Sequence, residues 1–177
     1  MHRLFAAIDL PDSIKETLDR FCHGIPGAKW VLNKQFHLTL RFIGEVDGAV
    51  FSDVAEALSE IQVAPFELRL KGMGFFPPRG EPQLLWAGVD KSEPVIHLRN
   101  KIERILIQAG LEPEGRKFSP HITLARLKGA AHSKVSEFLA FNGLYQSPVF
   151  SVTEFCLFSS FLSKSGSIYQ KEESYLL

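Results

Sequence analysis

The chain has few of the features that would mark a metalloprotein, a membrane protein or a binder of long nucleic acid. Only two cysteines, Cys22 and Cys156, occur among 177 residues, and their separation fits no zinc motif. No apolar run approaches the roughly 20 residues that span a bilayer, and Asp9 comes too early for a signal peptide. Lys plus Arg and Asp plus Glu both total 20, which argues against bulk electrostatic binding of nucleic acid. We therefore expect a cytoplasmic, monomeric protein with reduced, buried thiols and no membrane association.

Acidic residues are absent from two windows of the sequence, 20–44 and 115–136. Besides Arg20 at the start of the first, these windows contain the basic residues Lys29, Lys34, Arg41, Arg116, Lys117, Arg126, Lys128 and Lys134. Local positive charge on a neutral protein favours an anionic ligand. The same windows lack the carboxylates that commonly help to hold a catalytic metal. The sequence thus predicts an anion-binding site that uses no metal and no cofactor.

Each window contains one copy of a tetrapeptide, His37-Leu38-Thr39-Leu40 in the first and His121-Ile122-Thr123-Leu124 in the second. The chain has six His and four Thr, so two such copies are unexpected by chance. Residues i and i+2 of a β-strand point to the same face. Each copy therefore places an imidazole and a hydroxyl on one side and two aliphatic side chains on the other. A single copy would favour a structural role, whereas two equivalent copies favour a functional site.

The two halves of the chain resemble each other when the sequence is offset by 84 residues. This offset superimposes the two tetrapeptides and aligns residues 66–76 with residues 150–160. A period of this length fits one duplication and is too long for a solenoid. A hydrophobic content of 45% with 15 Phe is ample for a core. We therefore expect a single domain over residues 1–177, made of half-repeats at about 1–78 and 82–177.

Hydrophobic periodicity predicts strands and helices in alternation in both halves. Strands are expected at 3–9, 36–45, 66–76, 83–89, 120–127, 149–160 and, after a hairpin-like turn at Lys164-Ser165-Gly166, near 167–176. Helices are expected over about 12 residues from Pro11 and at 49–61, 94–109 and 132–141. We predict an α+β, bilobal fold in which two antiparallel sheets with flanking helices are related by a pseudo-two-fold axis.

If the two tetrapeptides face each other across a groove, they supply a pair of imidazoles suited to general acid–base catalysis. Histidine titrates near neutral pH, so one ring can hold a proton while the other lacks one. In a displacement at phosphorus, one His takes the proton of an attacking water and the other protonates the departing oxygen. Thr39 and Thr123 would donate hydrogen bonds to the phosphoryl oxygens. The near-symmetric residues alone leave open which His is the acid.

Residues near the tetrapeptides receive separate interpretations. Arg41 is in phase with the His and Thr of the first copy, which places it in the groove or, as an equal alternative, at a solvated strand edge. Phe42 is out of phase and is expected to pack inside, and Trp30 and Trp86 are expected in the core. The other histidines have no repeat partner and are interpreted as surface or capping residues: His2, His23, His97 and His132.

Several blocks outside the tetrapeptides extend the pattern over nearly the whole chain: residues 3–8, Trp30, 37–44, 75–77, 85–89 and 118–126, with Ser159, Ser160, Gly166 and Tyr169 matching less tightly. With these flanks, the chain resembles the two-histidine (2H) phosphoesterase superfamily, and most closely its RNA 2′,3′-cyclic phosphodiesterases, once called 2′-5′ RNA ligases. The resemblance implies metal-independent hydrolysis of a 2′,3′-cyclic phosphate at an RNA end to a 2′-phosphate. The implied ligands are RNA ends or small cyclic or 2′-5′-linked nucleotides.

The resemblance also implies roles for individual residues. His37 would be the proton donor, His121 the proton acceptor, and Arg126, five residues after His121, a phosphate-binding residue. An ideal strand turns that position away from the face of His121, so the role requires a bulge or strand end that re-aims Arg126. Two other functions stay open, namely a nucleotide-binding module without turnover and 2′-5′ RNA ligation by the reverse reaction.

Overall fold

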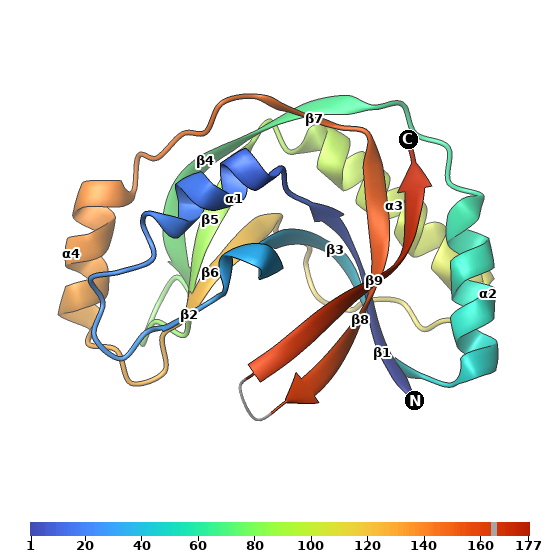
Figure 1. Ribbon diagram of the computed structural model, residues 1–177, viewed down its shortest axis with the longest axis horizontal. Coiled ribbons are helices and arrows are strands. Elements are labelled where there is room, and N and C mark those ends of the chain that lie inside the picture. The colour runs from blue at the N-terminus through green and yellow to red at the C-terminus, as the bar shows by residue number, and fades with distance from the viewer. Residues whose placement is uncertain (164–165) are drawn as a thin grey trace.

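The computed structural model describes residues 1–163 and 166–177 and has an α+β fold built on a strongly curled antiparallel sheet (Figure 1). The strands are β1 (His2–Asp9), β2 (Lys29–Trp30), β3 (His37–Val46), β4 (Phe66–Phe76), β5 (Leu84–Asp90), β6 (His121–Arg126), β7 (Phe150–Val152), β8 (Glu154–Ser163) and β9 (Gly166–Leu176). The helices are α1 (Asp12–Asp19), α2 (Gly48–Ser59), α3 (Glu93–Gln108) and α4 (His132–Asn142), with a 3₁₀ turn, η1, at Asn33–Gln35. Within the described residues, no helix has both the length and the apolar character that a membrane crossing needs.

Most of the predicted elements are confirmed, with shifts of one or two residues at their ends. α1 is shorter than predicted because the chain leaves the helix at Asp19 and continues in a turn. The strand predicted at 149–160 is divided into β7 and β8, which pair with β4 and β9 respectively. The short elements β2 and η1 have no counterpart among the predicted elements. Of the predicted hairpin turn, Lys164 and Ser165 lie outside the described residues.

The strands join into one sheet, which differs from the predicted pair of sheets. The strand order is β7-β4-β5-β6-β3-β1-β8-β9, and β2 pairs with β6. The two tetrapeptides lie on the neighbouring central strands β3 and β6, where Leu38 is the partner of Ile122. This pair is the one position at which β3 and β6 are joined in the described ladder, and the sheet curls away from it on both sides (Figure 1).

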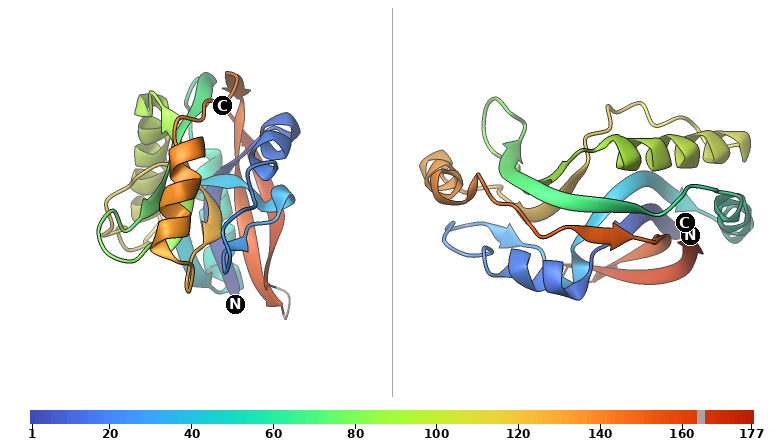
Figure 2. Two further views of the ribbon diagram at one scale, coloured as in Figure 1. Left: turned by 90° about the vertical axis from the view of Figure 1, so that its left-hand side faces the viewer. Right: turned by 90° about the horizontal axis from the view of Figure 1, so that it is seen from above.

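The two faces of β1 have different surroundings because its side chains alternate. Leu4, Ala6 and Ile8 belong to the main core, which α3 covers with Val95, Leu98, Ile102 and Leu106 at helical spacing. Phe5 and Ala7 point to the opposite face and join Cys156, Phe158 and Tyr169 in a second, smaller cluster. α3 and α1 lie on opposite sides of the sheet in both views of Figure 2. Burial of each Leu or Ile of the main core stabilises the fold by roughly 1.5–3 kcal/mol. Because the main core supplies most of the apolar burial, the second face can carry a polar site.

Candidate active site

The two histidines of the tetrapeptides are diagonal neighbours across the centre of the sheet. Leu38 and Ile122 are antiparallel partners, so continuation of this register sets His37 toward Thr123 and His121 toward Thr39. Diagonal neighbours of an antiparallel pair lie roughly 7–8 Å apart. The charge of His121 is one of the influences that lower the pKa of His37. The two imidazoles are therefore near enough for the charge of one to act on the other.

Both imidazoles are oriented by the same local hydrogen bond. Nδ1 of His37 lies 2.7 Å from the carbonyl oxygen of Gln35, and Nδ1 of His121 lies 2.7 Å from the carbonyl oxygen of Ser119. A carbonyl oxygen only accepts, so each Nδ1 carries a proton and donates it. Each Nε2 is thereby left as the ring nitrogen that can gain or lose a proton. The partner is in each case the backbone two residues before the His, which no side-chain pattern in the sequence reveals.

His37 lies in an aromatic cluster at the edge of the second face. Its ring centroid is 4.9 Å from that of Phe5 and 5.3 Å from that of Tyr169. Burial lowers the pKa of His37 below its ordinary value of 6.5, against the opposing influence of the Gln35 hydrogen bond and of Asp9, its neighbour across the β1–β3 ladder. The free protein therefore holds His37 mainly neutral at pH 7.

A β-bulge follows the Thr of each tetrapeptide. In β3, Thr39 opposes Ala7 and Arg41 opposes Ala6, so Leu40 is an extra residue. In β6, Thr123 opposes Trp86 and Ala125 opposes Leu85, so Leu124 is an extra residue. An extra residue reverses the alternation of the side chains beyond it. The fifth residue after each His therefore returns to the face of that His.

The second bulge aims Arg126 to the face of His121, as its expected role requires. Arg126 opposes Leu84, which shares a strand face with Trp86, the partner of Thr123. Arg126 lines the same pocket as His37. Its guanidinium group forms no ion pair or hydrogen bond with any residue that the structure describes. The role of Arg126 thus has a geometric basis that ideal strand alternation lacked.

The prediction that Arg41 reaches the groove is wrong, and the first bulge is the reason. Arg41 is 6% exposed and points into the main core. Its Nε donates to Oε2 of Glu103 on α3 at 2.5 Å, and its Nη2 donates to the carbonyl oxygen of Glu112 at 2.5 Å. A carboxylate of Glu114 lies 3.6 Å from Nη1. Arg41 therefore fastens β3 to α3 and to the segment that leads toward β6.

The position expected to be internal, Phe42, lies instead on the face of His37. Its ring stacks on Phe5 at 6.0 Å and carries the guanidinium of Arg3 at 5.3 Å. Trp86, expected in the core, is half-buried on the same face as Thr123 and packs against Phe76 at 5.3 Å. Phe76 in turn contacts His121 edge-on at 5.2 Å. Each catalytic candidate is thus supported by aromatic side chains.

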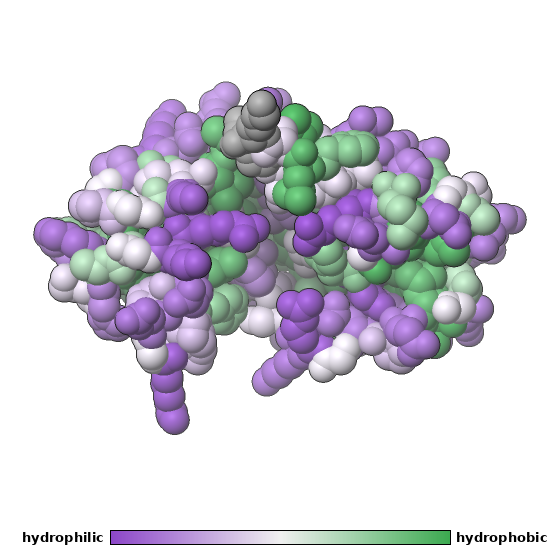
Figure 3. Space-filling model, turned by 90° about the horizontal axis from the view of Figure 1, so that it is seen from below, coloured by the Kyte–Doolittle hydropathy of each residue, from purple (hydrophilic) through white to green (hydrophobic). Residues whose placement is uncertain are grey.

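A pocket of about 410 Å³ opens beside His37. It is lined by Arg3, Phe5, His37, Phe42, Arg126, Ser160, Leu162, Ser167 and Tyr169. The lining contains two arginines and no carboxylate, which suits an anion. The hairpin of β8 and β9 forms one wall, and Gln35 fastens this wall by donating from Nε2 to the carbonyl oxygen of Ser167. Figure 3 shows a hollow in the face seen from below.

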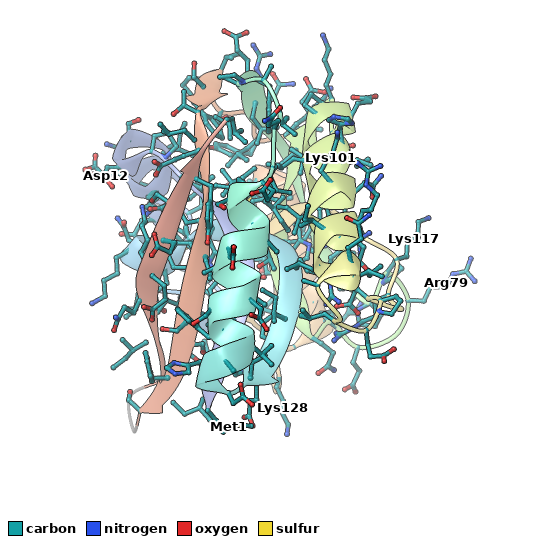
Figure 4. The ribbon with its side chains drawn as sticks, turned by 90° about the vertical axis from the view of Figure 1, so that its right-hand side faces the viewer. Met1, Asp12, Arg79, Lys101, Lys117 and Lys128 are labelled. Atoms are coloured by element: carbon teal, nitrogen blue, oxygen red, sulfur yellow. The ribbon has the colours of Figure 1, made fainter. Side chains whose placement is uncertain are left out.

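The acid-free windows predict the sign of the charge at the site correctly, but most of their basic residues lie outside the pocket. Arg126 is the one basic residue of the two windows that lines this pocket. Lys117 projects outward beyond α3 (Figure 4), and Arg116 and Lys134 pair with Glu114 and Glu137. The second arginine of the pocket, Arg3, lies outside both windows, and the sequence marked it only as the first residue of the matching block at 3–8.

The hydroxyls of Thr39 and Thr123 form no hydrogen bond with a described residue, so they are available to a ligand. The four remaining histidines lie away from this pair. His97 is exposed on α3, His132 begins α4 beside Phe75, His2 packs on Phe51, and His23 lines a different pocket with residues of α4. Cys156 is buried and Cys22 is half-buried, and both are free thiols. Among the described residues, no three His, Cys, Asp or Glu side chains gather as a metal site would require.

A curled sheet that sets two His-x-Thr strands side by side next to an arginine-lined pocket defines a phosphoesterase of the two-histidine class. Residues 10–160 match the family described as the 2′-5′ RNA ligase superfamily, and the chain belongs to this superfamily.

Individual relatives agree with this membership over nearly full length. The RNA 2′,3′-cyclic phosphodiesterase of Aeropyrum pernix is 37% identical over 163 residues, which cover 91% of this chain and 89% of the relative. The crystal structure of a Thermus thermophilus protein, TT0787, is 28% identical, with a TM-score of 0.83 and 99% and 97% of the two chains covered. E. coli LigT complexed with 3′-AMP is 26% identical, with a TM-score of 0.82 and 99% and 98% covered.

Proposed function

We propose that this protein hydrolyses 2′,3′-cyclic phosphates at RNA ends to 2′-phosphates, without a metal, by a paired-histidine acid–base mechanism. The observation that carries the proposal is the equivalent state of His37 and His121. Each donates from Nδ1 to a backbone carbonyl at 2.7 Å, and each thereby presents Nε2 for proton transfer. The names of relatives such as the Aeropyrum pernix enzyme support the same reaction.

In the proposed reaction, His121 accepts a proton from a water that attacks phosphorus. The bond between phosphorus and the 3′-oxygen breaks, and His37 gives a proton to this departing oxygen, which leaves a 2′-phosphate. Thr39, Thr123 and Arg126 donate hydrogen bonds to the phosphoryl oxygens, whose charge grows in the transition state. Each proton transfer contributes roughly 10²–10⁴ in rate.

The acid role of His37 requires a proton that burial disfavours in the free protein. A cyclic phosphate carries a negative charge, and a negative charge within a few ångströms favours the imidazolium form. Substrate binding therefore supplies the protonation that the free protein lacks. His121 stands on the more open side of the pair, between Phe76 and the backbone of Ser119, where water can approach it.

A second candidate reaction is 2′-5′ ligation, which the description of the matched superfamily favours. It is the reverse of the cleavage of a 2′-5′ linkage, and a 5′-hydroxyl replaces water as the nucleophile that attacks the cyclic phosphate. His121 accepts the proton of this hydroxyl, the bond between phosphorus and the 3′-oxygen breaks, and His37 protonates the departing 3′-oxygen, which leaves a 2′-5′ diester. Small cyclic or 2′-5′-linked nucleotides are further proposed ligands, supported by the 3′-AMP complex of E. coli LigT.

We also infer a history of duplication, with half-repeats at about 1–78 and 82–177 that form one bilobal domain. The sheet order supports it, because β4-β5-β6 on one side of the centre mirrors β8-β1-β3 on the other. The bulges at Leu40 and Leu124, at the same place in each motif, support it independently. We propose that the domain acts as a monomer, since one chain supplies both histidines.

The test is incubation of the purified protein, with a chelator present, with nucleoside 2′,3′-cyclic phosphates and with RNA ending in a cyclic phosphate. We expect the 2′-phosphate as the product and the same rate with and without chelator. A 3′-phosphate product, or activity lost on chelation and restored by a divalent ion, would contradict the mechanism. Tight nucleotide binding without any turnover or ligation would identify a binding module instead.

A further inference from the structure

On the basis of the function proposed above, we propose that Arg3 binds a second phosphate, the one attached to the 5′-oxygen of the terminal nucleoside. The pocket would then select the end of an oligonucleotide, or a 5′-phosphorylated nucleotide, over a nucleoside 2′,3′-cyclic phosphate that has no other phosphate. Arg126 and the two Thr would hold the reacting phosphate, and Arg3 would hold its neighbour.

Arg3 lies on β1, on the strand face that points toward the site. Arg3, Phe5 and Ala7 share the face of the sheet that bears the site, because side chains of a strand alternate. The ring of Phe5 contacts that of His37 at 4.9 Å, and Arg3 begins roughly 7 Å farther along the strand, two residues away. This is about the length of one nucleotide step, so Arg3 is one phosphate removed from the reacting group.

The charge of Arg3 is not neutralised by any described acidic residue. Arg3 is exposed and lines the pocket, and within the described residues its guanidinium has no ion pair. Glu45 is its partner across the β1–β3 ladder, yet the two side chains form no salt bridge. The guanidinium instead lies over the ring of Phe42, 5.3 Å from the centroid. Its N–H groups have no partner among the described residues, so they can donate to phosphate oxygens.

The pocket is large enough for a nucleotide. Its volume of about 410 Å³ falls in the range of roughly 300–1,000 Å³ that small-molecule sites occupy. This is far more than the reacting phosphate alone would fill. Arg3 and Arg126 come from different strands, β1 and β6, and no carboxylate is among the lining residues. Phe42, Leu162 and Tyr169 add aromatic and apolar surface to the same lining, which can accept the nucleoside.

The experiment compares kcat/KM for three substrates: a nucleoside 2′,3′-cyclic phosphate, the same compound with a 5′-phosphate, and a dinucleotide with a 2′,3′-cyclic phosphate end. We expect the second phosphate to raise kcat/KM about 10-fold at low salt, the effect of about one charge-assisted contact. Arg3→Ala should abolish this preference, so that the three substrates give similar values of kcat/KM. Arg3→Lys should retain part of the preference, because the charge stays.

The 5′-phosphorylated compound and the dinucleotide distinguish a terminal phosphate from an internal diester as the natural ligand of Arg3. A preference for either one supports the proposal. No preference in the unaltered protein, or an equal fall on all three substrates in Arg3→Ala, would overturn it. Arg104→Ala removes an exposed charge from α3 on the far side of the sheet. This control variant is expected to keep both the kcat/KM of each substrate and the preference for a second phosphate.

A binding measurement keeps this inference separate from the proposed activity. The affinity of adenosine 2′-monophosphate and adenosine 2′,5′-bisphosphate is measured for the unaltered protein and for Arg3→Ala. We expect the bisphosphate to bind about 10-fold more tightly, only when Arg3 is present, and the difference to shrink with added salt. This result would support the second phosphate site even if no cyclic phosphate were hydrolysed. Equal affinities would overturn it even in an active enzyme.

Discussion

Leu38 of β3 is the antiparallel partner of Ile122 of β6, and this pair relates the two halves of the active site. The residues that flank these two aliphatics are His37, Thr39, His121 and Thr123. Because the pair is buried on the core face, its neighbours all point to the opposite face. One hydrophobic contact thus sets two imidazoles and two hydroxyls around one point.

Replacement of Arg126 is expected to affect the reaction and not the fold. Arg126→Ala should lower kcat/KM by about 10- to 100-fold through loss of a charge-assisted contact with phosphate. The free energy of unfolding should change by less than about 0.5 kcal/mol, because the side chain is exposed. Steady-state kinetics and urea denaturation measure the two quantities. A stable variant with normal kinetics would remove Arg126 from the site.

Replacement of Arg41 should have the converse effect. Arg41→Ala leaves the carboxylate of Glu103, which is 13% exposed, without its main partner. We expect the free energy of unfolding to fall by about 3 kcal/mol, at the lower end of the usual range because Arg99 lies 3.6 Å from the same carboxylate. The KM of folded Arg41→Ala should stay near its original value. A raised KM with unchanged stability would return Arg41 to the substrate site.

Removal of either active-site hydroxyl is expected to slow the reaction. Thr39→Val and Thr123→Val keep the shape of the side chain and remove its donor, so kcat should fall about 10- to 100-fold. Thr39→Ser and Thr123→Ser should retain most of the rate. Thr153, which is exposed between β7 and β8, provides the matched control as Thr153→Val. Normal kcat in both site variants would show that the hydroxyls do not contact the phosphate.

The protonation of His37 should change when an anionic ligand binds. Burial holds the pKa of His37 below 6.5 in the free protein, and a bound 2′-phosphate should raise it. Between the two pKa values the complex therefore takes up a proton, and binding strengthens as the pH falls through this window. NMR titration of the His37 ring with and without adenosine 2′-monophosphate measures the change. The signal of His97 on α3 is the control that the ligand should not move, and an unmoved His37 would argue against its role as the acid.

The sequence predicted the elements and the histidine pair because both follow from local pattern. Apolar periodicity fixes strands and helices. The His and Thr of each tetrapeptide both precede the bulge in their strand, so regular alternation holds between them. Beyond the Thr, strand alternation failed at Arg41 and Phe42. The extra residue in each strand is determined by pairing with β1 and β5, which no run of neighbouring residues reveals.

Other features depended on contacts between distant parts of the chain. The join at Leu38 and Ile122 turns two expected sheets into one, and Arg3 reaches the pocket only because β1 lies between β3 and β8. The hydrogen-bond partners of the two histidines are backbone carbonyl groups. Every residue has such a group, so the type of residue at these positions does not reveal the contact. The family resemblance anticipated Arg126, whereas the physical reason for its position is the bulge at Leu124.

The most direct test of the central claim is the rate of cyclic phosphate hydrolysis in chelator by His37→Ala, His121→Ala and the double variant. If the two histidines act as one acid–base unit, each single change should lower kcat by roughly 10²–10⁴. The double change should then cost little more than either single one, since groups that act together are non-additive. Near-normal activity in either single variant would contradict the paired-histidine mechanism.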